Sequence, residues 1–264
     1  MIPTKTPTQS LGVMTALLLG LTLPISAHAI GDGSKLKIAQ IRYNGAWDTR
    51  KKAPLVLAQE VRFRTSIDVQ LTPTVVGLTD PAFFELPFAL LTGNSRFRLS
   101  TRERSLLKKW LEGGGFLLVD NTGRSEPSPG FDQSIRTVIS DMFPNRTFKK
   151  IPPQHVLYRT FYILDYPAGR VIRRPFLEGL FLDGRVAVVY SQNDLTGAMD
   201  RDRLGAWTYD VAPGGEEQRE KAKRLATNII QYAMCLDYKD DQVHLDHLLH
   251  KRRWKIQAPT IQAP

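Results

Sequence analysis

Strand-like and helix-like segments alternate along most of this chain, and this alternation restricts the fold more than any other feature of the sequence. A helix is predicted to begin at Ser100 or Thr101 and to end at the glycine run 113–115. It leads directly into residues 116–119 (FLLV), an apolar run typical of a strand that is covered on both faces. The pattern predicts an α/β fold, with a mainly parallel sheet and helices on both faces.

Periodicity, capping residues and turn signals predict the other elements in the same way. Asp183-Gly184 is a strong hairpin signal between two short strands. The predicted strands cover residues 36–43, 68–71, 88–91, 116–119, 180–182 and 185–190, and the predicted helices cover residues 53–64, 101–112, 131–142 and 216–235.

The first 29 residues have the pattern of a cleavable secretory signal peptide. Lys5 is followed by an apolar run over residues 11–23, and Ala27 and Ala29 supply the small residues of a cleavage site. The run is shorter than the roughly 20 residues that a membrane-spanning helix needs. We therefore expect a periplasmic protein that begins near Ile30, with an uncleaved amphipathic anchor as the alternative.

The remaining residues are expected to form one domain and a tail. Residues 30–236 are within the single-domain range of α/β folds, and residues 237–264 form a basic C-terminal tail. The only cysteine, Cys235, lies in an apolar helical pattern, so a buried and inert thiol is predicted.

The net charge indicates which partners to expect. It is +10 for the whole chain and +9 without the predicted leader, which carries one lysine and no acidic residue. Outside the cytoplasm this favours anionic envelope ligands or an envelope protein, and we expect no nucleic-acid partner because the charges are scattered. The cluster from Lys251 to Lys255 brackets Trp254, which predicts a peripheral membrane contact through the tail.

Polar residues follow several predicted strands, where ligands bind in parallel α/β folds. Their other interpretation is structural, since Asn and Asp often end strands because they tolerate turn conformations. The predicted ligand-binding residues are Asn44, Trp47, Asp48, Thr92, Gly93, Asp120, Asn121, Ser191, Asn193, Asp194 and Arg201.

Several familiar motifs are missing or weak. The run 113–115 precedes a strand, whereas a phosphate loop opens a helix, and there is no Gly-x-Ser-x-Gly elbow. His244, His247 and His250 recur at helical spacing, but a solvated or docking surface is favoured over a metal site. We predict no metal and no cofactor. His155 is expected to be a packed or pocket-lining residue, with catalysis as the alternative.

Taken together, several segments resemble bacterial domain-of-unknown-function family 4159, whose members occur alone in exported proteins or fused to membrane proteins of the aerotolerance-regulator type. The resemblance covers nearly all of the chain after the leader. It is carried by residues 44–48, 91–93, 113–121, 177–179, 183–185, 190–194 and 236–239. It implies a fold similar to class I glutamine amidotransferases, which have a flavodoxin-like sheet and a site at the strand ends.

The resemblance also bears on activity. Amidotransferases carry a nucleophilic cysteine on a tight elbow after the strand that corresponds to residues 116–119, and here Asp120-Asn121 stands at that position. Carboxylate and carboxamide side chains cannot supply a thiolate. This favours a binding or interaction module in the cell envelope.

The alternative is an envelope hydrolase that uses Asp120 and Asp194 as acid and base, with His155 nearby. Such chemistry requires the two carboxyl groups to lie within roughly 5–10 Å of each other. The catalytic residues are therefore left open, with these three as candidates.

Overall fold

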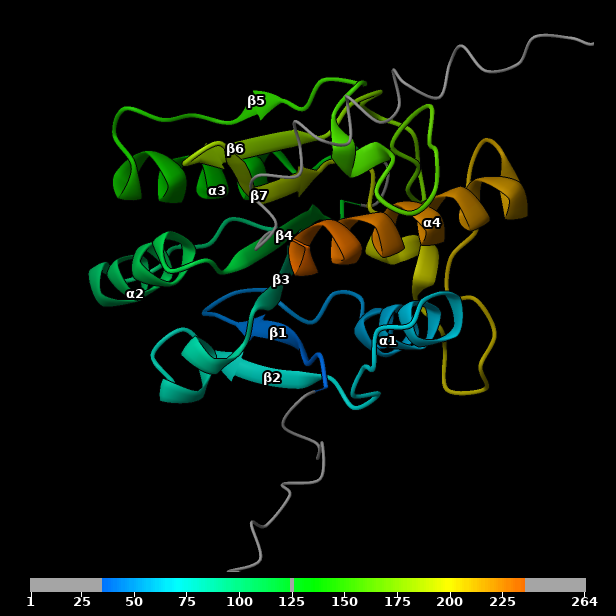
Figure 1. Cartoon of the computed structure of the whole chain (residues 1–264), viewed down its shortest axis with the longest axis horizontal. Helices are drawn as coiled ribbons and strands as arrows, with labels where there is room; N and C mark the ends of the chain where they lie inside the picture. Colours follow the sequence, from blue (N-terminus) through cyan, green and yellow to red (C-terminus); the bar gives the residue numbers. More distant parts are fainter. Residues whose placement is uncertain (1–34, 124–125, 236–264) are drawn as a thin grey trace, which may run out of the picture.

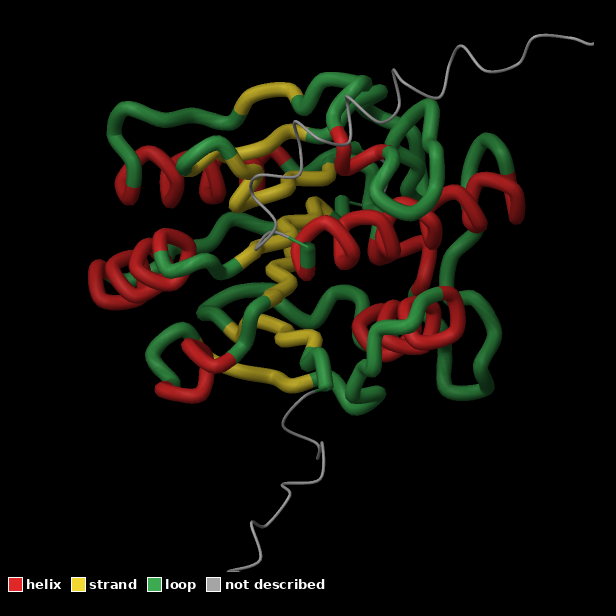
Figure 2. The backbone as a smooth tube through the Cα atoms, viewed as in Figure 1, coloured by secondary structure: helices red, strands yellow, loops and turns green. Residues whose placement is uncertain are grey.

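The computed structural model describes residues 35–123 and 126–235, which form a mixed sheet between two layers of helices (Figures 1 and 2). The strands are β1 (Ile38–Arg42), β2 (Thr74–Gly77), β3 (Phe88–Gly93), β4 (Phe116–Asn121), β5 (Lys149–Lys150), β6 (Glu178–Leu182) and β7 (Arg185–Ser191). Their order in the sheet is β2-β1-β3-β4-β7-β6-β5. The first five in this order are parallel, and β6 and β5 are antiparallel to their neighbours. The predicted α/β fold is confirmed.

The helices cover both faces of this sheet, as predicted. Helices α1 (Ala53–Arg64) and α4 (Gly215–Met234) pack on one face, and α2 (Thr101–Glu112) and α3 (Pro129–Met142) pack on the other. In Figure 1 the two pairs lie to the right and to the left of the strands. The described residues also contain three short 3-10 helices: η2 (Pro81–Glu85), η3 (Val156–Tyr158) and η4 (Thr196–Met199).

Alternation of apolar side chains along the central strands produces the two cores. In β4, Phe116 and Leu118 belong to the core under α1 and α4, and Leu117 and Val119 belong to the core under α2 and α3. Successive side chains of a strand point to opposite faces, so a strand with helices on both sides must be apolar throughout. This is why the continuous run predicted a doubly covered strand.

The ends of α2 follow from local chemistry. Ser100 and Glu103 form a reciprocal capping box, and Gly113 caps the other end. Gly114 has φ +109°, a conformation that residues with a Cβ rarely adopt, and a Cβ at position 115 would collide with the Trp110 ring. The glycine run thus ends the helix and lets the chain turn closely under it into β4.

One predicted strand is wrong. Residues 68–71 contribute only an isolated bridge between Val69 and Leu36, and the edge strand β2 lies at Thr74–Gly77. Edge position explains the error, because β2 pairs with β1 alone and Val75 is left exposed, so the segment lacks the apolar run of an inner strand. The two-residue strand β5, at the other edge, was not predicted either.

The prediction for the cysteine is also wrong. Cys235 is exposed, because α4 ends at Met234 and the thiol lies one residue past its last turn. The buried stripe of α4 stops at Tyr232. The predicted helix extends one residue too far, and Cys235 lies beyond the buried stripe.

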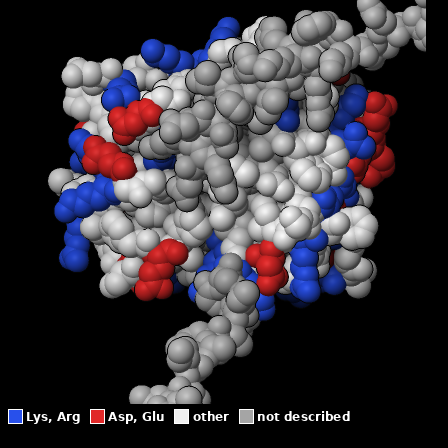
Figure 3. All heavy atoms as spheres, in the orientation of Figure 1, with Lys and Arg blue, Asp and Glu red and all other residues white. Residues whose placement is uncertain are grey.

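The parallel strands follow the order 2-1-3-4-7, which begins as the flavodoxin-like order does. Assignment to the flavodoxin-like or amidotransferase-like class stays a prediction. Acidic and basic side chains are interspersed on the face shown in Figure 3. Across residues 35–123 and 126–235, no helix has the length and apolarity required to cross a bilayer. The predicted leader, the three tail histidines and the basic tail lie outside the described residues.

Candidate functional site

The chain changes direction across the sheet between β1 and β3. From β1 it passes to β2 on one side, and from β3 it passes to β4 on the other side. In doubly wound sheets the crevice beyond the carboxyl ends of two such strands is the usual ligand site. Most of the predicted ligand-binding residues lie at this end of the sheet, on β3, β4 and the last residue of β7, and in the loops after β1 and β7.

The loop after β1 folds back over the crevice. The Trp47 carbonyl accepts hydrogen bonds from Thr92 Oγ1 at 2.7 Å and from Gln40 Nε2 at 3.1 Å. Tyr43 Oη donates to the Thr92 carbonyl at 2.9 Å, and burial raises the pKa of this phenol. A Cβ at Gly93 would lie 2.3 Å from Tyr43 Oη, so the glycine allows this close approach.

A pocket of about 240 Å³ lies beside this loop. Two of the predicted residues, Trp47 and Asp48, line it, and Asn44 is exposed outside it. Thr92 and Gly93 are buried and serve to hold the loop. The full lining consists of Gln40, Trp47, Asp48, Arg50, Lys51, Pro54, Pro73 and Val75.

Asp194 is buried in a cluster with two arginines. Arg50 bonds it in bidentate fashion, with Nε 2.9 Å from Oδ1 and Nη2 2.7 Å from Oδ2, and Arg170 Nε also donates to Oδ2. The aspartate has φ +51°, and a Cβ at Gly197 would collide with its carboxylate. Arg50 stacks 4.2 Å from the centroid of the Tyr209 ring. This carboxylate joins the loops after β1 and β7.

Asp120 is fully buried at the end of β4 and accepts three hydrogen bonds. They come from the backbone N–H groups of Leu195, at 3.0 Å, and Thr196, at 2.7 Å, and from Thr196 Oγ1 at 2.5 Å. Burial, and secondly the charge of Asp194, raise the pKa of Asp120 to about 6, while the three donors act in the opposite direction. The carboxyl group anchors the start of η4.

These contacts do not favour acid–base chemistry by the two carboxylates. Asp194 is 1% exposed and ion-paired, and Asp120 is 0% exposed with both oxygens hydrogen-bonded. A general acid or base must reach the proton that it transfers, directly or through one water. Neither group has that access, so the hydrolase hypothesis finds no support in this geometry.

The expected position of His155 near the two aspartates is wrong. His155 caps η3, where Nδ1 accepts from the N–H of Leu157 at 3.2 Å, and its ring packs against Phe181 and Tyr232. Tyr232 Oη in turn accepts from the N–H of Val186, near the amino end of β7. His155 thus lies toward the opposite end of β7 from Asp194, and burial lowers its pKa.

Asn121 and Asn193 are structural hubs. The amide of Asn121 bonds the N–H groups of Gly123 and Ser128, the Ser128 carbonyl and Tyr190 Oη. The side-chain amide of Asn193 likewise accepts from the N–H groups of Arg173 and Arg174 and donates to the carbonyls of Pro167 and Arg174. The backbone N–H of Asn193 donates to Ser191 Oγ. Both side chains are buried, and they hold loops in place.

Arg201 lies apart from these residues, in a hairpin-like loop. Its guanidinium stacks 3.6 Å from the centroid of the Trp207 ring and donates to the Gly205 carbonyl at 2.5 Å. Sequence reasoning placed it at the strand ends only because it follows Asp194 closely in the chain. Conversely, it missed Arg50 and Arg170, since nothing in the sequence connects either of them with Asp194.

Within residues 35–123 and 126–235, no three His, Cys, Asp or Glu side chains are grouped as a metal site would need. Asp194 does not have the surroundings of a metal ligand, because the guanidinium groups of Arg50 and Arg170 occupy the positions around its carboxylate.

The raised pKa of Asp120 gives a testable pH dependence. The pKa is about 6 in the folded protein and 3.8 ordinarily, so the folded state binds the proton more tightly. The stability that this proton contributes is complete below about pH 4 and is lost as the pH rises through about 6. We expect the ¹³Cγ resonance of Asp120 to titrate with a midpoint near pH 6. A resonance that shows full ionisation at pH 5 would contradict this.

Fold and site together define an α/β protein in which a polar cluster at the strand ends is buried and internally bonded. The chain belongs to the family described as Domain of unknown function (DUF4159), whose match covers residues 37–234. It is also similar to an aspartate/glutamate leucyltransferase of Chromohalobacter salexigens, with 31% identity over 124 residues, covering 42% of this chain and 47% of that protein. The chain therefore spans about half the length of this curated relative.

Proposed function

We propose that this chain is an exported binding module of the cell envelope, built on an amidotransferase-like scaffold without a nucleophile. The observation that carries the proposal is the carboxyl end of β4, where an amidotransferase would present its cysteine. Asp120 and Asn121 stand there, fully buried, and their side-chain oxygens and the Asn121 amide bond to neighbouring loops. The position serves to hold loops and presents no group to a substrate.

The pocket beside the β1 loop is the proposed binding site. Its Trp47 side chain is partly exposed and offers an aromatic surface. Lys51 is 76% exposed and pairs with Asp48 at 3.3 Å, an ion pair that solvent screens. The charge of Arg50 is directed inward to Asp194. An anionic envelope ligand would therefore contact Lys51 and stack on Trp47.

Export and the amidotransferase-like class are parts of this proposal that come from the sequence. We do not propose a leucyltransferase activity, because the segment matched in that relative covers 47% of its length. The basic tail would add a second attraction to an anionic membrane surface, worth about 1 kcal/mol for each basic residue near that surface.

Calorimetric titration with purified lipopolysaccharide tests the site. We expect Lys51→Gln to weaken binding about fivefold, the equivalent of about 1 kcal/mol for one cation beside an anionic ligand. Lys109→Gln, which removes the same charge from the exposed face of α2, is the matched control and should bind as the unaltered chain does. Equal affinities of all three proteins, or no binding by any, would refute the proposed site.

A further inference from the structure

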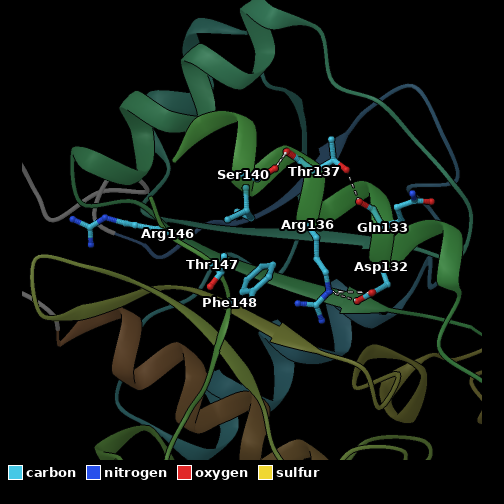
Figure 4. A pocket seen from close by; sticks show the side chains of 9 residues that line it. Asp132, Gln133, Arg136, Thr137, Ser140, Arg146, Thr147 and Phe148 are labelled. Atoms are coloured by element: carbon cyan, nitrogen blue, oxygen red, sulfur yellow. Dashed lines mark hydrogen bonds and ion pairs between the residues drawn. The ribbon is translucent and has the colours of Figure 1, made fainter. Parts of the chain in front are cut away.

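A second and larger pocket lies on the other side of the sheet, away from the β1 loop. Its volume is about 440 Å³, within the range of about 300–1,000 Å³ typical of small-molecule sites. One wall is the outer side of α3, with Asp132, Arg136, Thr137 and Ser140, and the other wall is the segment before β5, with Phe148 (Figure 4). The function proposed above does not involve this pocket.

The charges in this pocket are balanced internally. Arg136 Nε lies 3.0 Å from both carboxylate oxygens of Asp132, and Arg136 Nη2 lies 2.7 Å from Glu178 Oε2. In Figure 4 the Arg146 side chain points away from the pocket. The Arg136 guanidinium, in contrast, faces the pocket but is already paired with the carboxylates of Asp132 and Glu178, so the pocket offers little net attraction to an anion.

Further hydrogen bonds hold Asp132 and Glu178, the two partners of Arg136, in place, and the Asp132–Arg136 pair remains partly accessible. Tyr190 Oη donates to Asp132 Oδ1 at 3.0 Å, and Gln192 Nε2 donates to Glu178 Oε2 at 2.7 Å. Asp132 is 30% exposed and Arg136 40% exposed, so each keeps hydrogen-bonding capacity toward the pocket. A fixed carboxylate beside a fixed guanidinium presents acceptors and donors next to each other, which suits a ligand whose neighbouring groups are both donor and acceptor.

Aromatic and hydroxyl groups complete the lining. The Phe148 ring is partly buried and lies near Arg136, whose guanidinium carbon is 5.7 Å from the ring centroid. Thr137 and Ser140 use their hydroxyl protons within α3, which leaves oxygen lone pairs available to accept. A ring face with adjacent hydroxyl acceptors matches a sugar, which has weakly polarised C–H groups on its faces and hydroxyls at its edge.

We propose that the pocket between α3 and Phe148 binds an uncharged saccharide unit, with the sugar ring on Phe148 and its hydroxyls on Asp132 and Arg136. The site is distinct from the crevice at the β1 loop. The two pockets have no lining residue in common, and Tyr190 Oη, which donates to Asp132, accepts from Asn121 Nδ2 at the end of β4.

Saturation-transfer NMR on the full-length chain tests this, with N,N′-diacetylchitobiose and maltose as the probes at millimolar concentration. We expect transfer to the ring C–H protons of at least one probe. Thr137→Trp, which fills the pocket from an exposed position on α3, should abolish that transfer. Phe148→Ala should weaken binding about fivefold through loss of the ring face.

Phe161→Ala is the matched control, because Phe161 is also a partly exposed phenylalanine but does not line the pocket. It should leave the transfer unchanged. No transfer to either sugar, or equal transfer in the Thr137→Trp protein with an unaltered circular dichroism spectrum, would overturn the proposal. Lys51→Gln should not affect sugar binding, so this site and the crevice can fail independently.

Discussion

Replacing Arg50 with methionine is expected to lower the free energy of unfolding by about 3 kcal/mol, since removal of one partner from a buried ion pair leaves the other charge poorly compensated. Arg50 donates two hydrogen bonds to Asp194 and one to the Thr122 carbonyl, and all of these groups are buried. Arg170 still pairs with Asp194 in the variant, which keeps the loss below that of an isolated charge. Urea unfolding followed by circular dichroism measures the change.

Lys51→Met is the matched control for this substitution. It removes the same charge one position along the chain, where the side chain is 76% exposed and its ion pair with Asp48 is weak. We expect a change of at most about 0.5 kcal/mol. If the two variants unfolded at the same urea concentration, the cluster around Asp194 would not stabilise the fold as described.

Replacing Asn193 with aspartate is expected to lower the free energy of unfolding about as much as the Arg50 substitution does, although asparagine and aspartate have nearly the same shape. The Asn193 amide donates to the carbonyls of Pro167 and Arg174, each at 2.8 Å. A carboxylate has no N–H group, so it would face two buried carbonyls with its negative charge. A loss of about 3 kcal/mol lowers the melting temperature by roughly 10 °C in a protein of this size, which calorimetry detects readily.

Asn44→Asp makes the same chemical change in the loop after β1, where the asparagine is exposed. Its melting temperature should stay within about 2 °C of the unaltered protein. Asn193 and Asn44 were both predicted to bind a ligand. Equal stability of the two variants would indicate that the Asn193 amide is free for that role.

Prediction succeeded where short-range chemistry decides the structure. The capping box at Ser100, the glycine stop of α2 and the Asp183-Gly184 turn each depend on residues close in the chain. The α1 helix begins and ends where predicted, at Ala53 and Arg64. Periodicity identified the inner strands because both of their faces must be apolar.

Prediction of the site was less successful, because the same residue types serve two purposes. Asp120, Asn121 and Asn193 do lie at the strand ends, as predicted, but their side chains bond to loops of the protein itself. An asparagine that binds a ligand and one that holds a loop look alike in a single sequence. Burial and the identity of the hydrogen-bond partners distinguish them, and both depend on the tertiary structure.

The sequence by itself thus determined the alternation of strands and helices, and with it a parallel sheet with two helical layers. These features follow from side-chain periodicity and local backbone preferences, which act over a few residues. Only the tertiary structure decided that Arg50 pairs with Asp194, 144 positions away, and that His155 lies toward the other end of the sheet. Such pairings depend on how distant segments pack, and no local pattern encodes them.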